Sequence, residues 1–133
     1  MEGELIMKEY ELIVIGMGPA GMAVTAMASN MDLDVLAIEK HKVGGECLNY
    51  GCIPSKALLK AGEMNEVTEN LEKYGIDFRG QTEVNNPLEI VQNKLDQISG
   101  SKTMKAFEKA DLILDKGKAE FVDQNTVKVG GEK

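Results

Sequence analysis

Residues 10–40 read YELIVIGMGPAGMAVTAMASNMDLDVLAIEK, and this stretch decides the fold. Tyr10–Gly16 is a short apolar, β-branched run without alternation, which is typical of a strand buried on both faces. Met22–Met31 is rich in the helix formers alanine and methionine, and Leu33–Lys40 again has the pattern of a buried strand. A strand–helix–strand unit of about 30 residues has the size of a βαβ crossover. The stretch therefore predicts two parallel strands joined by a right-handed connection.

Three glycines stand between the first predicted strand and the predicted helix. Gly16, Gly18 and Gly21 form the pattern G-x-G-x-x-G, in which they allow a tight turn, close approach of backbone to a pyrophosphate, and close helix–strand packing. The helix that follows offers free N–H groups and a positive dipole end to phosphates. Glu39 ends the second strand, 21 positions after Gly18, where an acid is expected to bind a ribose hydroxyl. The alternative is a tight turn that binds nothing, and the agreement of all these parts favours a dinucleotide site.

Both cysteines lie in residues 44–56, GGECLNYGCIPSK, which we call the redox segment. Zinc would need three or four ligands, and the chain offers Cys47, Cys52 and the single histidine His41, for which we expect a solvated loop. The N-terminus lacks the pattern of a signal peptide, so we expect a cytoplasmic protein, in which a purely structural disulfide would be unusual. The pair is better explained as a reactive dithiol than as a zinc knuckle or a structural cross-link.

The surroundings of the pair support this interpretation. Cys52 lies immediately before a helix that we expect to begin near Pro54, where the dipole and free N–H groups stabilise a thiolate. Lys56 adds positive charge one turn further on, and a second thiol at short range allows exchange through a mixed disulfide. The glycines of the segment would let a flat cofactor come close: Gly44, Gly45 and Gly51. The alternative is two packed thiols that merely lie near each other.

The remainder of the chain predicts two long helices and a group of short strands. Apolar residues at helical spacing indicate one helix from about Pro54 to Tyr74, and Asn86–Pro87 is typical of the start of another. Gly100 and Ser101 either interrupt this second helix or are carried within it towards Ala110. Residues 110–131 predict two or three strands, with a turn at residues 123–126. We expect the eight methionines to pack mostly in the core.

Bulk composition excludes several classes of protein. With 15 basic and 22 acidic residues the net charge is −7, which is unsuited to binding a nucleic-acid backbone. No apolar run approaches the roughly 18 residues that span a bilayer. We therefore expect neither a nucleic-acid nor a membrane partner.

The segment GGECLNYGCIPSKALL resembles the redox-disulfide signature of the class I pyridine nucleotide–disulfide oxidoreductases, and the resemblance extends over essentially the whole chain. It implies an α/β, Rossmann-like FAD-binding domain with a parallel sheet, two long helices and a small β-meander. Cys47 then matches the thiol that exchanges with substrate, and Cys52 the thiol that passes electrons to the flavin. Lys56 matches the lysine near the flavin N5, and Ala119 a small residue at the adenine. The cofactor-binding set implied in this way is Gly16, Gly18, Pro19, Ala20, Gly21, Glu39, Lys40, Gly45, Glu46, Cys47, Cys52, Lys56 and Ala119.

Some residues depart from the family pattern. Glu46 stands where threonine is common near the flavin phosphates, and a carboxylate there would repel them unless it turns away. Thr25 replaces a small residue of the first helix, and Asp32 replaces a glycine that often ends it. Pro19 in the glycine loop favours FAD over a nicotinamide by family habit. The Ser55–Lys56 pair is more similar to the dihydrolipoamide dehydrogenase branch than to the glutathione reductase branch.

The resemblance also implies a longer protein. A second G-x-G-x-x-G and the acid–base His–Glu pair of the family have no counterpart in residues 1–133, and His41 precedes the cysteines and cannot supply it. We expect these residues to be the N-terminal portion of a FAD-binding domain, without the NAD(P)-binding and dimerisation domains and inactive alone. The implied function is electron transfer between a nicotinamide, FAD and a dithiol such as dihydrolipoamide or a lipoyl domain, in a homodimer. Alternatives are a mercuric or other disulfide reductase and a non-catalytic flavin-binding redox module.

Overall fold

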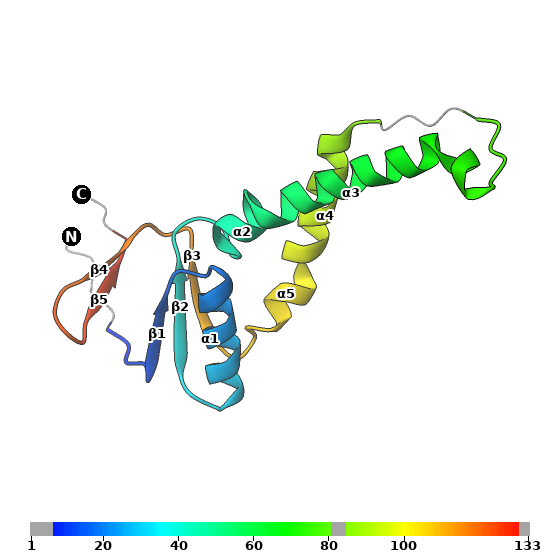
Figure 1. The fold of residues 1–133 in the computed structure, drawn as a ribbon. Coiled ribbons are helices and arrows are strands. Elements are labelled where there is room, and N and C mark those ends of the chain that lie inside the picture. The colour runs from blue at the N-terminus through cyan, green and yellow to red at the C-terminus, as the bar shows by residue number, and fades with distance from the viewer. Residues whose placement is uncertain (1–6, 81–84, 131–133) are drawn as a thin grey trace.

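A parallel three-stranded sheet forms the centre of the protein. The computed structural model describes residues 7–80 and 85–130. Strands β1 (Leu12–Ile15), β2 (Val35–Glu39) and β3 (Asp111–Leu114) lie in the order β1–β2–β3, and helix α1 (Pro19–Asn30) crosses from β1 to β2 and lies against one face (Figure 1). The predicted βαβ unit and its parallel pairing are confirmed. Helix α1 begins three residues earlier than expected, because Pro19 suits the first turn of a helix.

The two strands of the predicted unit differ in burial. All five residues of β2 are buried, because this strand has neighbours on both sides, with Leu12 paired to Val35 and Leu36 paired to Asp111. Strand β1 is only half-buried, and Ile15 is 46% exposed. Burial on both faces is therefore confirmed for the second strand and wrong for the first, which lies at an edge of the sheet.

The core lies between the sheet, α1 and the turn before β3. Met17, Ala37 and Phe107 form its fully buried cluster, and Met22 and Met104 pack against it. Four other methionines are exposed, so the expectation that methionines fill the core is wrong for them, because they lie where no other described part of the chain covers them: Met7, Met27, Met31 and Met64.

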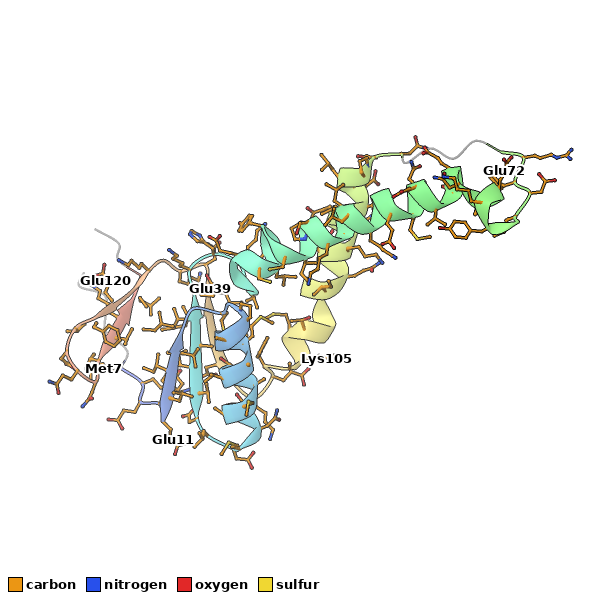
Figure 2. All side chains as sticks on the ribbon, in the orientation of Figure 1. Met7, Glu11, Glu39, Glu72, Lys105 and Glu120 are labelled. Atoms are coloured by element: carbon orange, nitrogen blue, oxygen red, sulfur yellow. The ribbon has the colours of Figure 1, made fainter. Side chains whose placement is uncertain are left out.

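Two long helices extend away from the sheet. After the short helix α2 (Gly45–Asn49), α3 (Cys52–Glu69) continues into the 3-10 turn η1 (Leu71–Tyr74). Helix α4 (Pro87–Ser99) crosses α3 and contacts it on the way back towards the sheet (Figure 1). We call α3 and α4 the helix pair; Glu72 marks its far end in Figure 2. Gly100 separates α4 from α5 (Ser101–Lys105), so this glycine interrupts the helix rather than being carried to Ala110.

The C-terminal strands divide between two sheets. β4 (Ala119–Phe121) and β5 (Val127–Val129) form an antiparallel hairpin with the expected turn, in which the Asn125 N–H donates to Asp123 at 2.8 Å. The small β-meander is corrected to this two-stranded hairpin, because β3 pairs with β2 in the parallel sheet instead. In the described parts of the chain, no helix is long and apolar enough to cross a membrane.

Candidate functional site

The glycine loop, residues 16–21, makes a tight turn between β1 and α1. Gly16 has a φ of +94°, which favours glycine, and a Cβ on Gly21 would lie 1.9 Å from the Gly16 carbonyl oxygen. A Cβ built on Gly16 or Gly18 would meet nothing within 4 Å, so the loop faces open space. Pro19 and Ala20 begin α1, whose first N–H groups have no partner within the helix. The loop thus combines an open surface with free donors.

Glu39 is held at the end of β2 by the backbone beside the loop. Its side chain is nearly buried, with Oε2 accepting the Met17 N–H and Oε1 accepting the His41 N–H, both at 2.8 Å. Figure 2 shows Glu39 at the end of the sheet from which α2 and α3 leave. Each carboxylate oxygen keeps a further lone pair for a ribose hydroxyl. The ribose contact stays a prediction, whereas the two backbone contacts were missed by sequence reasoning.

The redox segment contacts the glycine loop directly. The Gly44 N–H donates to the Met17 carbonyl at 2.6 Å. A Cβ on Gly45 would lie 2.9 Å from Gly18 Cα, and both Gly44 and Gly45 have positive φ. Two motifs separated by more than 20 residues are thereby brought together, and the glycine at position 45 permits the approach. The hydrogen bond between Met17 and Gly44 was not predicted, because Gly44 was expected only to let a flat cofactor come close and Met17 gave no signal.

The two cysteines lie on consecutive helices. Cys47 is half-buried in α2, and Cys52 is exposed as the first residue of α3; both are free thiols. The pKa of Cys47 is raised mainly by a hydrogen bond with Cys52 and secondly by loss of solvation. The positive charge of Lys56 opposes this rise only in part. In the reduced pair Cys47 therefore holds its proton more firmly than an ordinary thiol does.

The helix after the cysteines begins earlier than expected. Cys52 belongs to α3, and Pro54 is its third residue, so the prediction that Cys52 precedes the helix is wrong by two positions. The residue still lies in the first turn, where backbone N–H groups have no helical partner. Lys56 is exposed one turn further on.

The other predicted site residues lie on several elements of the chain. Lys40 follows β2 and is exposed, as is Glu46 in α2. Ala119 begins β4, in the separate hairpin, so its adenine contact stays a prediction. His41 is exposed, as expected for a solvated loop. Within the described residues, no group of three or more His, Cys, Asp or Glu side chains could hold a metal ion.

The residues present fit a dinucleotide. Open space lies over Gly16 and Gly18, where a pyrophosphate can approach the backbone, and a carboxylate lies at the end of the neighbouring strand. A pair of thiols follows on a segment that contacts the same loop. Fold and site together define a nucleotide-binding α/β unit joined to a dithiol.

Comparisons with known proteins give the family. The model of the pyridine nucleotide-disulphide oxidoreductases matches residues 10–133, and the chain belongs to this family, whose members use FAD and NAD(P). It is 39% identical to the dihydrolipoyl dehydrogenase of Mycoplasma pneumoniae over 126 residues, which cover 92% of the chain and 27% of that protein. It is 31% identical to a mercuric reductase of Staphylococcus aureus, over 93% of the chain and 23% of that enzyme.

A solved structure shows the same fold. The Cu(II) complex of the HOCl-induced flavoprotein disulfide reductase RclA from Escherichia coli matches with a TM-score of 0.72 and 22% identity. The match covers 94% of this chain and 25% of that one. The chain thus spans about a quarter of the length of the relatives it matches.

Proposed function

We propose that the chain is the N-terminal portion of the FAD-binding domain of a dihydrolipoyl dehydrogenase, and that it carries the dithiol of that longer protein. The observation that carries the proposal is the contact between the glycine loop and the redox segment, through Gly18, Gly45 and the Met17–Gly44 hydrogen bond. This contact brings the start of the segment that carries both cysteines against the glycine loop, which supports the proposal. The similarity to several dihydrolipoyl dehydrogenases and the Ser55–Lys56 pair support the choice within the family.

The residues of the chain divide into a binding set and a reacting pair. The glycine loop and the start of α1 would hold the pyrophosphate, Glu39 a ribose hydroxyl, and Ala119 the adenine. Lys56 would place positive charge near the flavin ring. When bound, FAD supplies a two-electron acceptor and donor. Because Glu46 is exposed, its carboxylate can turn away from the phosphates.

The dithiol chemistry balances within the pair. A thiolate of the reduced substrate attacks the Cys47 sulfur of the Cys47–Cys52 disulfide, which forms a mixed disulfide and releases Cys52 as a thiolate. The second substrate thiol then displaces Cys47, so that the substrate leaves as a disulfide and the protein holds two electrons in its dithiol. FAD held at the glycine loop would accept those two electrons and make them available to a nicotinamide. In the longer protein we expect a homodimer.

Reconstitution tests this function. We expect the purified protein to bind FAD, and anaerobic dihydrolipoamide to bleach the visible absorbance of that flavin. Cys47→Ser should retain the bound FAD and lose the bleaching, because the exchanging thiol is gone. Cys52→Ser should lose the long-wavelength band that a thiolate beside the ring produces. A control variant, Lys105→Ala, changes an exposed residue of α5 outside the site and should behave as the wild type.

Two results would contradict the proposal. Failure to bind FAD would remove the cofactor assignment, and bleaching that survives in Cys47→Ser would remove the assigned role of the dithiol. Nicotinamide-dependent reduction of a disulfide by residues 1–133 alone would overturn the expectation that further domains are needed. A mercuric reductase of Bacillus cereus is 35% identical over 92% of the chain, so reduction of Hg(II) by the longer protein, in place of oxidation of dihydrolipoamide, would move the assignment to that branch.

A further inference from the structure

The two cysteines are joined by a linker of four residues that folds back on helix α2. The Tyr50 N–H donates to the Glu46 carbonyl at 2.9 Å, so the chain turns as soon as α2 ends. A Cβ on Gly51 would lie 3.3 Å from that carbonyl oxygen and 3.8 Å from Cys47 Cα. The residue before Cys52 therefore packs against the backbone of Cys47, and the two thiols come into hydrogen-bond contact.

Asn49, the last residue of α2, directs its side chain back along that helix. Its amide nitrogen donates to the Gly45 carbonyl at 2.9 Å and to the Val43 carbonyl at 3.1 Å. Val43 lies in the connection between β2 and α2, so one side chain ties the end of the helix to the chain that precedes it. A helix of five residues is not stable through its own backbone hydrogen bonds. The Asn49 amide therefore helps to hold α2, and Cys47 within it, in place.

The start of α2 is anchored separately, by backbone hydrogen bonds. The Gly44 N–H donates to the Met17 carbonyl of the glycine loop at 2.6 Å, and the Gly45 N–H donates to the Lys42 carbonyl at 3.2 Å. These bonds do not involve the Asn49 side chain, so they remain when it is removed. Loss of the Asn49 amide should thus loosen the end of α2 and the linker, while the glycine loop keeps its place.

We propose that Asn49 is a positioning residue that keeps the Cys47 thiol in contact with Cys52 by fixing the end of α2. Without its amide the linker takes up more conformations, and bringing the two sulfurs together costs more conformational entropy. Closure of the disulfide then becomes less favourable, because the pair is no longer arranged in advance. The inference rests on the proposed function in one respect, the exchange of this pair between dithiol and disulfide.

The first test is the pH profile of Cys47 alkylation in the longer protein. The pKa of Cys47 is raised mainly by its contact with Cys52. Asn49→Ala weakens this contact, so the midpoint of the profile should move to lower pH. Iodoacetamide labelling followed by mass spectrometry reads the Cys47 peptide alone. A profile that stays in place would show that Asn49 contributes stability without positioning the thiol.

The second test is the equilibrium of the pair with glutathione. One glutathione disulfide oxidises the protein dithiol to its disulfide and is reduced to two glutathione thiols. In Asn49→Ala we expect the equilibrium constant for forming the protein disulfide to fall about fivefold, the factor that corresponds to one hydrogen bond. Alkylation of the remaining thiols and mass spectrometry of the two cysteine peptides give this constant.

Further variants separate position from stability. Asn49→Leu keeps a branched side chain but has no N–H donor, so it should behave as Asn49→Ala does. The matched control is Asn70→Ala, since the Asn70 amide donates at 2.7 Å to the Glu66 carbonyl, four positions earlier, far from the cysteines. It should leave both readouts at their wild-type values. Should the Asn49 variants fail to fold, Gly51→Ala is the second route, because its Cβ presses on the Glu46 carbonyl and displaces the linker.

The outcomes distinguish this proposal from the proposed function. If the wild-type pair forms its disulfide and the constant in the Asn49 variants is unchanged or higher, the positioning role is overturned while the dithiol function stands. If the wild-type pair forms no disulfide in any glutathione buffer, both fail. Equal shifts in Asn70→Ala would also overturn the positioning role, because general loss of stability would then explain them.

Discussion

The sheet unit and the helix pair are built in opposite ways. In β2 all five residues are buried, whereas none of the 18 residues of α3 is buried. Around the glycine loop, hydrogen bonds join residues 22 or 27 positions apart, such as Met17 with Glu39 and with Gly44. Side-chain hydrogen bonds along the helix pair, such as that from Lys60 to Glu63, join residues three or four positions apart.

This difference shows where the described chain is stabilised. Long-range hydrogen bonds fix the glycine loop. The two helices pack on each other around an open groove of about 640 Å³, and most of their surface is exposed. Its floor is mainly apolar, with residues from both helices: Ile53, Ala57, Ala61, Met64, Ile90 and Ile98. Local side-chain pairs contribute only a few tenths of a kcal/mol each. Substitutions should therefore be costly near the sheet and mild on the helices.

The largest effect is expected in the core. Phe107→Ala should lower the free energy of unfolding by about 3–5 kcal/mol, because a side chain only 2% exposed leaves a cavity against Met17 and Ala37. Leu59→Ala on α3, where the side chain is 73% exposed, should change it by less than about 0.5 kcal/mol. Urea unfolding followed by circular dichroism measures both. Similar losses in the two variants would contradict the comparison.

Glycine positions sharpen the same contrast. Gly21→Ala places a Cβ 1.9 Å from the Gly16 carbonyl oxygen. Gly16 directly follows β1, so its backbone is held by the sheet and cannot easily move away. We expect a loss of about 3 kcal/mol and a fall of roughly 10 °C in Tm, measured by thermal unfolding. Gly62→Ala in α3 should instead stabilise by about 0.5–1 kcal/mol, since alanine is the better helix former and the space is open. A neutral Gly21→Ala would show that α1 does not pack on the loop as closely as described.

A third test concerns the thiols, where the two regions meet. The pKa of Cys47 is raised chiefly by its hydrogen bond with Cys52, so Cys52→Ala should lower that pKa and increase the thiolate fraction at neutral pH. Alkylation of Cys47 by iodoacetamide should then become roughly threefold faster for each unit by which the pKa falls, after allowing for the lower nucleophilicity of a less basic thiolate. The pH profile of the rate gives the pKa directly. Cys52→Ser, which keeps a hydroxyl partner, is the control, and an unchanged profile in Cys52→Ala would refute the stated cause.

The predictable parts of the fold are those determined by neighbouring residues. The spacing of Gly16, Gly18 and Gly21 between strand and helix, and the turn at residues 123–126, depend on local backbone demands and were predicted. Strand β3 pairs with β2 across more than 70 positions, so no local pattern could assign it to the parallel sheet. Met17 occupies a variable position of the motif, and its importance comes from Glu39, Thr25 and Gly44, which only the folded chain brings to it.

The smallest expected effect lies at the end of α1, where a departure from the family pattern meets a backbone constraint. Asp32 has a φ of +61°, in the left-handed region that costs a residue with a side chain about 1 kcal/mol. Asp32→Gly removes this strain, but it adds flexibility to the unfolded chain and loses an exposed ion pair with Lys109. We expect a net stabilisation of roughly 0.5 kcal/mol, measured by urea unfolding. Lys109→Ala, which breaks only the ion pair, should be near neutral, so an Asp32→Gly protein less stable than Lys109→Ala would mean that the ion pair outweighs the backbone strain at this turn.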